Sequence, residues 1–272
     1  MKKYLLSSSV LGTAMLLAMV AGAAAADLPV YTKAPPPAPP TWSWTGFYIG
    51  VQGGSGWGTN ELNETSVQLV PVTGVIPVVP NSASASYGLN GWHGGGTAGY
   101  NWQAGQIVFG VEGDLSGANI SGRGDCTHAV TFPIQQAGCH TNMPWFGTLT
   151  GRLGVAVDHA LVYVKGGGAW AHFDHDSTGA FFTTFPVIPG FASAVGENRT
   201  GVTAGVGVEY AFWHNWSAKI EYDYMDFGTR NLAFVSVPIG PFTTINREDV
   251  SERVHVIKAG LNYRFDWGGS RY

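Results

Sequence analysis

The sequence predicts an all-β protein: an eight-stranded antiparallel transmembrane up-and-down β-barrel with four long external loops. Three observations lead to this fold class: alternation of apolar and polar residues, a regular succession of long and short connections, and the gathering of charged residues on one face. The alternation is clearest in 250–265, where every second residue from Ile257 to Phe265 is apolar while Lys258 and Arg264 lie between them. A period of two indicates a strand. An apolar face opposite a charged face is typical of a barrel whose outer wall contacts lipid and whose lumen is polar.

The composition excludes several other classes of protein. The 272 residues include 39 glycines, only 12% are charged, and the formal charge is −4. Loss of a leader that holds Lys2 and Lys3 would make that charge −6. Nucleic-acid binding requires a basic face, so we expect no nucleic-acid partner. A mean hydropathy of +0.06 argues against helical membrane spans but not against a barrel, in which only alternate residues face lipid.

The chain divides into four predicted parts. Residues 1–26 have the charged start, apolar middle and small-residue end of a secretory signal peptide. Residues 27–45 form a proline-rich periplasmic segment, in which K-A-P-P-P-A-P-P is expected to be a polyproline II spacer. The barrel is predicted over 46–265, and a short tail follows at 266–272.

The order of connections is the second observation. Strands are predicted over 46–58, 91–103, 106–119, 144–157, 160–173, 199–212, 217–228 and 250–265. Long segments follow the first, third, fifth and seventh strands, and short turns follow the second, fourth and sixth. Bacterial outer-membrane barrels show this asymmetry, with short periplasmic turns and long external loops. An even number of strands places both ends of the barrel in the periplasm.

The third observation is the sorting of charge. Five acids and five bases fall on the faces predicted to point inward, so their formal charges sum to zero. They are Glu112, Asp114, Glu209, Glu221, Asp223, Arg152, Lys165, Lys219, Lys258 and Arg264. A buried charge is costly unless it is paired and hydrogen-bonded. Because eight strands enclose a space that side chains nearly fill, we expect a plugged interior with inward glycines making room for long side chains. Aromatic residues near the strand ends are expected to form girdles at the headgroup level.

Both ends of the barrel resemble one family. A leader that ends before A-D-L-P is followed by a proline-rich spacer and W-T-G-F-Y-I-G (44–50), and the chain closes with K-A-G-L-N-Y-R-F (258–265). These features resemble the Omp25/Omp31-type outer-membrane proteins of alphaproteobacteria. The resemblance implies a small OmpA-like barrel in the cell outer membrane and a structural surface protein. Some members of that family are described as haemin-binding or host-contact proteins. D-W-G-G-S-R-Y (266–272) departs from the pattern, because it extends the chain past the terminal aromatic residue of the assembly signal.

Two groups of residues could carry chemistry in the external loops. Cys126 and Cys139 share one predicted loop in an oxidising compartment, so we expect a disulfide, with free thiols or a zinc site with His128 and His140 as alternatives. The run from His172 to Asp176 offers metal ligands in His172, Asp174, His175 and Asp176. Haemin could use these histidines together with nearby loop phenylalanines. We expect no metal site and no cofactor, with haemin as the alternative.

We therefore predict a non-enzymatic structural protein that supports envelope integrity and presents surface loops. The sequence contains no nucleophile elbow, phosphate-binding loop or H-E-x-x-H motif. The inward acids have no Ser/His partner at a strand end, as a barrel lipase or protease would require. The expected partners are outer-membrane lipid and lipopolysaccharide, the barrel-assembly machinery, and cell-wall or host surfaces. The alternatives are a haemin-binding surface protein, a narrow solute pore, and a soluble secreted barrel with an apolar lumen.

Overall fold

The computed structural model describes residues 42–71, 79–80, 84–128, 134–182, 188–235 and 242–265. All of them belong to one compact unit of the chain, Pro40–Tyr272. The predicted signal peptide, most of the proline-rich segment and the tail at 266–272 lie outside the described residues, so these three assignments stay predictions.

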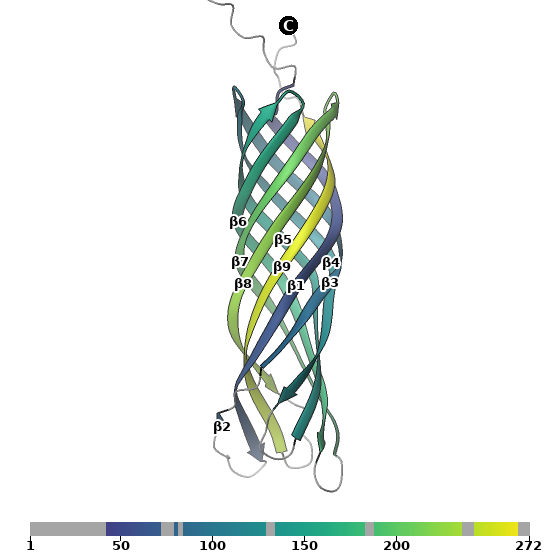
Figure 1. The fold of residues 1–272 in the computed structure, drawn as a ribbon, viewed down its shortest axis with the longest axis vertical. Helices are drawn as coiled ribbons and strands as arrows, with labels where there is room; N and C mark the ends of the chain where they lie inside the picture. The colour runs from purple at the N-terminus through teal and green to yellow at the C-terminus, as the bar shows by residue number, and fades with distance from the viewer. Residues whose placement is uncertain are drawn as a thin grey trace, which may run out of the picture. The chain divides into compact units, whose positions relative to one another are not determined.

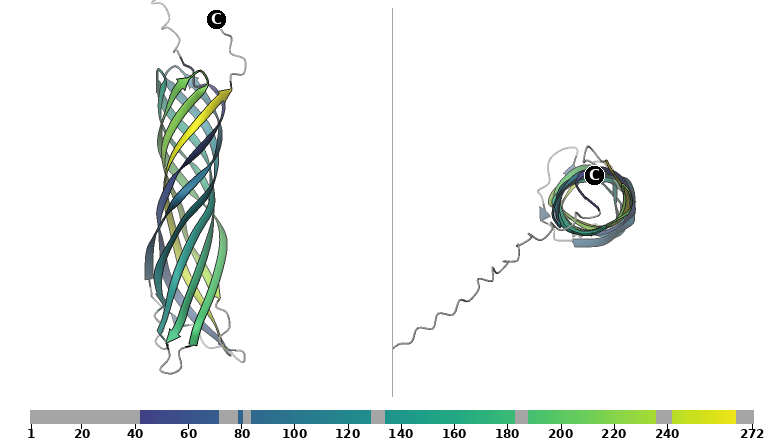
Figure 2. Two further views of the ribbon diagram at one scale, coloured as in Figure 1. Left: turned by 90° about the vertical axis from the view of Figure 1, so that its right-hand side faces the viewer. Right: turned by 90° about the horizontal axis from the view of Figure 1, so that it is seen from above.

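Eight long strands form one closed antiparallel barrel (Figures 1 and 2). They are β1 (Gly46–Pro71), β3 (Ser84–Ala104), β4 (Ile107–His128), β5 (Ile134–Val157), β6 (Ala160–Phe182), β7 (Ile188–Trp213), β8 (Trp216–Val235) and β9 (Phe242–Phe265). Each strand pairs with the next along the chain, and β1 pairs with β9 to close the ring. A two-residue strand, β2 (Val79–Pro80), pairs with β1. The predicted fold class is confirmed.

The two ends of the barrel differ. At one end, two-residue turns join β3 to β4, β5 to β6 and β7 to β8. We call this the turn end. Gly105, Asp158 and His214 in these turns adopt positive φ, as tight hairpin turns often require. β1 begins and β9 ends at the turn end, where Phe47 pairs with Phe265. The strand ends that the longer connections join all lie at the opposite end, which we call the loop end. Among the described residues, no helix is long and apolar enough to cross a membrane.

An apolar band covers the outer wall near the turn end. Its large side chains are exposed to the surroundings, among them Val51 at 65%, Ile220 at 66% and Val202 at 65%. The band begins at aromatic residues such as Phe47 and Trp216, and on β1 it ends at Trp57, which is ten residues beyond Phe47. Ten residues of a tilted strand rise about 25 Å, the height of a membrane-facing band.

The strands are longer than predicted, and this corrects the boundaries expected from sequence. The long loops predicted over 59–90, 120–143, 174–198 and 229–249 are in large part strand, because the strands run on past the band and have 20 to 26 residues. A membrane span needs only about 9–11 residues. Beyond the band the outer face is polar, with Glu61, Asp174 and Arg253 as examples. We call this projecting part, beyond Trp57, Trp170 and Tyr224, the collar.

Candidate functional site

The lumen contains a network of buried ion pairs within the height of the apolar band. The structure brings together nine of the ten ionisable residues predicted to point inward, and each of them is at most 7% exposed. They are Glu112, Asp114, Arg152, Lys165, Glu209, Lys219, Glu221, Asp223 and Lys258. Five acids and four bases give a formal charge of −1, so nearly every buried charge is compensated.

Glu112 on β4 is the centre of the half of the network nearer the turn end. Its carboxylate lies 3.1 Å from Lys219 Nζ, 3.3 Å from Lys165 Nζ and 3.4 Å from Arg152. The Tyr48 hydroxyl donates a hydrogen bond to it at 2.7 Å. Arg152 on β5 also forms a 2.8 Å ion pair with Glu209 on β7. One carboxylate thus joins side chains from four other strands.

Lys258 on β9 holds the other half of the network. Its ammonium lies 2.8 Å from Asp223 and 3.1 Å from Asp114. Thr148 donates a further hydrogen bond to Asp114. Lys165, 3.2 Å from Asp223, links this half to Glu112. These contacts join strands on opposite sides of the barrel, so the side chains fill the interior at this height.

Inward glycines provide the space that the network occupies. A Cβ atom at Gly207 would lie 2.6 Å from the ring of Tyr163, and one at Gly99 would collide with Tyr48. The Arg152 guanidinium in turn lies 4.0 Å from the centre of the Tyr163 ring. The large aromatic and cationic side chains therefore fit only because residues on neighbouring strands have no side chain.

Two tryptophans that precede β1 close the lumen at the turn end. Trp42 and Trp44 are 8% and 2% exposed and pack with Val108, Ala156 and Leu161. The backbone N–H of Trp44 donates to the side chain of Gln103, which fixes the segment at the barrel mouth. This cluster was not predicted, because both tryptophans lie in the proline-rich periplasmic segment expected at 27–45, outside any predicted strand.

Arg264 lies apart from the nine network residues. Its guanidinium stacks over the ring of Trp42 at 4.3 Å, and its side chain is partly exposed at the turn end. The residue has the predicted inward orientation, but it is only one position from the end of β9 and so lies beside Trp42 at the mouth of the lumen.

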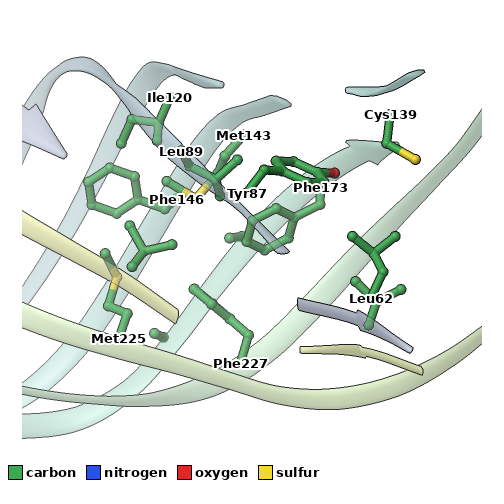
Figure 3. Packing of buried hydrophobic residues seen from close by; sticks show 14 of the residues in the cluster. Leu62, Tyr87, Leu89, Ile120, Cys139, Met143, Phe146, Phe173, Met225 and Phe227 are labelled. Atoms are coloured by element: carbon green, nitrogen blue, oxygen red, sulfur yellow. The ribbon is translucent and has the colours of Figure 1, made fainter. Parts of the chain in front are cut away.

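The lumen toward the loop end is apolar, which corrects the expectation of a polar interior throughout. Figure 3 shows side chains from several strands pointing toward one another there, including Ile120, Met143, Phe146, Phe173 and Met225. All five are 0% exposed. Alternation in the sequence separates the two faces of a strand, but it does not show that the apolar face turns from the lipid to the lumen where the outer residues become polar.

A second polar cluster lies in the collar and was missed from sequence. Thr141 bonds to His175 Nδ1 at 2.9 Å, and His175 Nε2 lies 3.3 Å from Glu252. Arg199 forms a 2.6 Å ion pair with Glu197 and lies 3.5 Å from Glu252. These residues fall in segments predicted to be loops or at their borders, so no strand register was available to place them on one inward face.

The proposed metal-ligand set does not converge. His172, Asp174 and Asp176 lie on the outer face of β6, whereas His175 points into the lumen, because neighbours in a strand point to opposite faces. No group of three or more metal-binding side chains occurs among the described residues. The phenylalanines invoked for haemin, at 181, 182, 185 and 191, are not among the side chains that the structure describes.

Cys126 and Cys139 form a disulfide between neighbouring strands β4 and β5. Both residues are buried, at 3% and 6% exposure, and belong to the apolar cluster of the collar. They therefore lie inside the barrel on paired strands, and not in an exposed loop.

Comparison with known proteins identifies the family. The model of the outer membrane protein beta-barrel domain matches residues 13–265. The chain belongs to this family. The 31 kDa outer-membrane immunogenic protein of Brucella melitensis is 31% identical over 93% of this chain and 98% of its own length.

Two further relatives agree with this assignment. The 25 kDa outer-membrane immunogenic protein of Brucella abortus is 27% identical over 96% of this chain and 99% of its own length. The 22 kDa outer membrane protein of Rhizobium leguminosarum is 28% identical over 72% of this chain and 70% of its own length. The outer membrane protein OprG of Pseudomonas aeruginosa is a solved structure that is 15% identical, with a TM-score of 0.45, and covers 81% of this chain and 97% of its own.

The predicted resemblance to the Omp25/Omp31 type is confirmed, and this barrel lies in the outer membrane. The turn end is then the periplasmic end, and the collar projects on the external side. The two Brucella relatives are named as outer-membrane immunogenic proteins.

Proposed function

We propose that this outer-membrane barrel is a structural protein that supports the envelope and presents its loop end to the surroundings. The observation that carries this proposal is the filled lumen. Paired charges occupy the interior within the apolar band, and Trp42 and Trp44 close the periplasmic mouth. A sealed, cross-braced cylinder is suited to a mechanical role and poorly suited to passing solutes.

The alternatives have less support. A narrow pore would need a continuous polar path, whereas apolar residues at 0% exposure, among them Ile120, Met143 and Phe146, lie between the two polar clusters. Haemin binding through His172 and His175 would need both imidazoles on one side of β6, and they lie on opposite sides. Catalysis by the lumen acids would need substrate access, and Glu112 is 1% exposed. We therefore propose no enzymatic activity and no resident cofactor.

Deletion of the gene in the native host tests the structural role. We expect the deletion strain to become sensitive to detergents and large antibiotics, and a plasmid copy of the parent gene to restore resistance. A plasmid copy with Lys258→Met, which breaks the lumen network, should lower the amount of folded protein in the membrane. Resistance should then be restored in proportion to that amount. A deletion strain with an unchanged envelope would contradict the proposal.

A further inference from the structure

The wall of the collar is incomplete between β7 and β8. These strands pair from Trp213 and Trp216 as far as Val202 and Asp226, and their pairing stops there. β7 nevertheless continues to Ile188, paired with β6, and β8 continues to Val235, paired with β9. Within the described residues, the segments 188–201 and 228–235 therefore each have a partner strand on one side only. We call the space between them the split.

A β-bulge in β8 accounts for the split. The register between β8 and β9 shifts between Asp226 and Thr229, and Gly228 adopts φ of 67°. A bulge bends the strand that carries it and increases its twist. A Cβ atom built on Gly201 would collide with the carbonyl of Asp226, so the two strands are still in contact at the base of the split. A Cβ atom on Gly228 would meet nothing within 4 Å.

Burial shows that the split opens the wall. Arg230 and Leu232 pair with Val250 and Glu248, which point inward and are buried, yet Arg230 is exposed and Leu232 is half-buried. Val195, which pairs with the buried His175, is also half-buried. The ladder between β3 and β4 likewise stops early, but Tyr87 and Leu89 in its unpaired segment stay buried at 7% and 2%. Ala85 in that segment is half-buried, but among these two breaks only the one between β7 and β8 has a fully exposed lumen-facing side chain larger than glycine, that of Arg230.

Arg199 limits the depth of the split. Its guanidinium donates hydrogen bonds to the carbonyls of Gly228 and Val250, so one side chain spans from β7 to β8 and β9 at the base of the split. Arg199 is 1% exposed. Above it, the N–H and C=O groups along the free edges of β7 and β8 have no strand partner among the described residues. Such edges are templates for the addition of another strand.

The surroundings of the split define the chemistry of that strand. On the lumen side, Val195, Leu232 and Phe234 are apolar and partly or fully buried, and Arg230 is the charged residue of β8 on this face. On the outer side, Asp174 pairs across β6 and β7 with Gly196, close to the free edge of β7. Around the whole collar, the described residues include ten acidic side chains and five arginines, a formal charge of −5. A strand that enters the split would thus have apolar residues facing inward and basic residues facing outward.

We propose that the split is a docking site for an extended, basic polypeptide segment of another protein, which adds to the free edge of β7 as an antiparallel strand. Every second side chain of the segment is apolar and covers Val195 and Leu232, and the intervening side chains are Lys or Arg. Backbone hydrogen bonds supply the binding, and charge complementarity selects the partner. This interaction goes beyond the structural role and does not depend on it.

The test uses the full barrel in phosphatidylcholine nanodiscs and a fluorescent peptide of about ten residues that alternates valine with lysine. Binding is followed by fluorescence anisotropy, with empty nanodiscs as the blank. We expect saturable binding and slower hydrogen exchange of backbone amides in 193–201. A peptide of the same sequence that is N-methylated at alternate residues should bind at least about tenfold more weakly, because it cannot form the edge hydrogen bonds.

Charge variants provide the matched control. Asp174→Lys should weaken binding by about threefold or more, and Asp125→Lys, two strands farther from β7 on the same outer face, should change it less than twofold. The interaction of exposed charges decays over about 8 Å, and the added strand would lie about 10 Å from β6 but about 20 Å from β4. Both side chains are on the outer face, so neither variant should alter folding. Three results would each overturn the proposal. The N-methylated peptide could bind as tightly as the unmodified one, hydrogen exchange in 193–201 could stay unchanged on adding the peptide, or the Asp174→Lys variant could bind the peptide as tightly as the parent protein.

Discussion

At the scale of single residues, the stability of the barrel depends on how charges are compensated in the lumen. Lys258 is 0% exposed and has two carboxylates within 3.1 Å. Removing one partner of a buried pair leaves an uncompensated charge, and this costs more than the pair contributes to stability. The same change on the outer surface of the collar has no such consequence, because water solvates the remaining charge.

The first prediction compares a buried with an exposed cation on the same strand. Lys258→Met should lower the free energy of unfolding by about 3–5 kcal/mol, because Asp114 and Asp223 lose their shared partner. Arg253→Met removes a side chain that is 48% exposed and should cost less than about 1 kcal/mol. Urea unfolding in lipid vesicles, followed by heat-modifiable gel migration, measures both. Equal losses for the two variants would show that the lumen pairs do not carry the stability.

The second prediction concerns an inward glycine. Gly207→Ala should destabilise the barrel by about 1–3 kcal/mol, because its methyl group would lie 2.6 Å from the Tyr163 ring. Gly166→Ala is the control, since a Cβ atom there meets its nearest neighbour at 3.5 Å, which is ordinary contact. The same unfolding assay applies. A Gly207→Ala variant as stable as the control would mean that Tyr163 can move without cost.

At the scale of elements, each strand has two parts that experience different surroundings. The part within the band has lipid outside and paired charges inside. The part in the collar has water outside and, for much of its height, apolar side chains inside. The direction of amphipathicity therefore reverses along a single strand.

The third prediction tests the disulfide as a local brace of the collar. Replacing Cys126 and Cys139 by serine removes a cross-link between paired strands that closes a loop of 13 residues. A loop of this size should contribute about 3 kcal/mol in the chain-entropy model. Hydrogen exchange should speed up in the collar parts of β4 and β5 and stay unchanged near Arg152 in the band. Faster exchange in the band as well would show that the collar and the band unfold as one unit.

The sequence allowed the strands within the band to be predicted, but not their full lengths. Alternation placed Ile257 and Lys258 on the correct faces, because lipid and lumen impose opposite polarities. Beyond Trp57 the outer residues are polar and many inner ones are apolar, so the pattern resembles that of a soluble sheet or a polar loop. The strand continuations, the inward orientation of His175 and the β7–β8 split depend on pairing between distant segments, which the sequence of one strand does not contain.

At the scale of the whole molecule, the lumen is divided into layers. From the periplasmic end outward these are the tryptophan pair, the ion-pair network and the apolar cluster, whose members lie on both sides of the polar cluster of the collar. Each layer joins strands from several sides of the barrel. The inward charges could be predicted from sequence, but the tryptophan layer could not, since Trp42 and Trp44 precede the first strand and have no register.

The fourth prediction is the most direct test of the central claim that paired charges seal the interior. In planar bilayers, the purified barrel should show no unitary conductance. The variant with Trp42→Ala and Trp44→Ala should also be silent, because the network centred on Glu112 closes the lumen independently of the periplasmic layer. Discrete conductance steps from the parent protein would contradict the account, since they would require a continuous water path through residues that the structure buries.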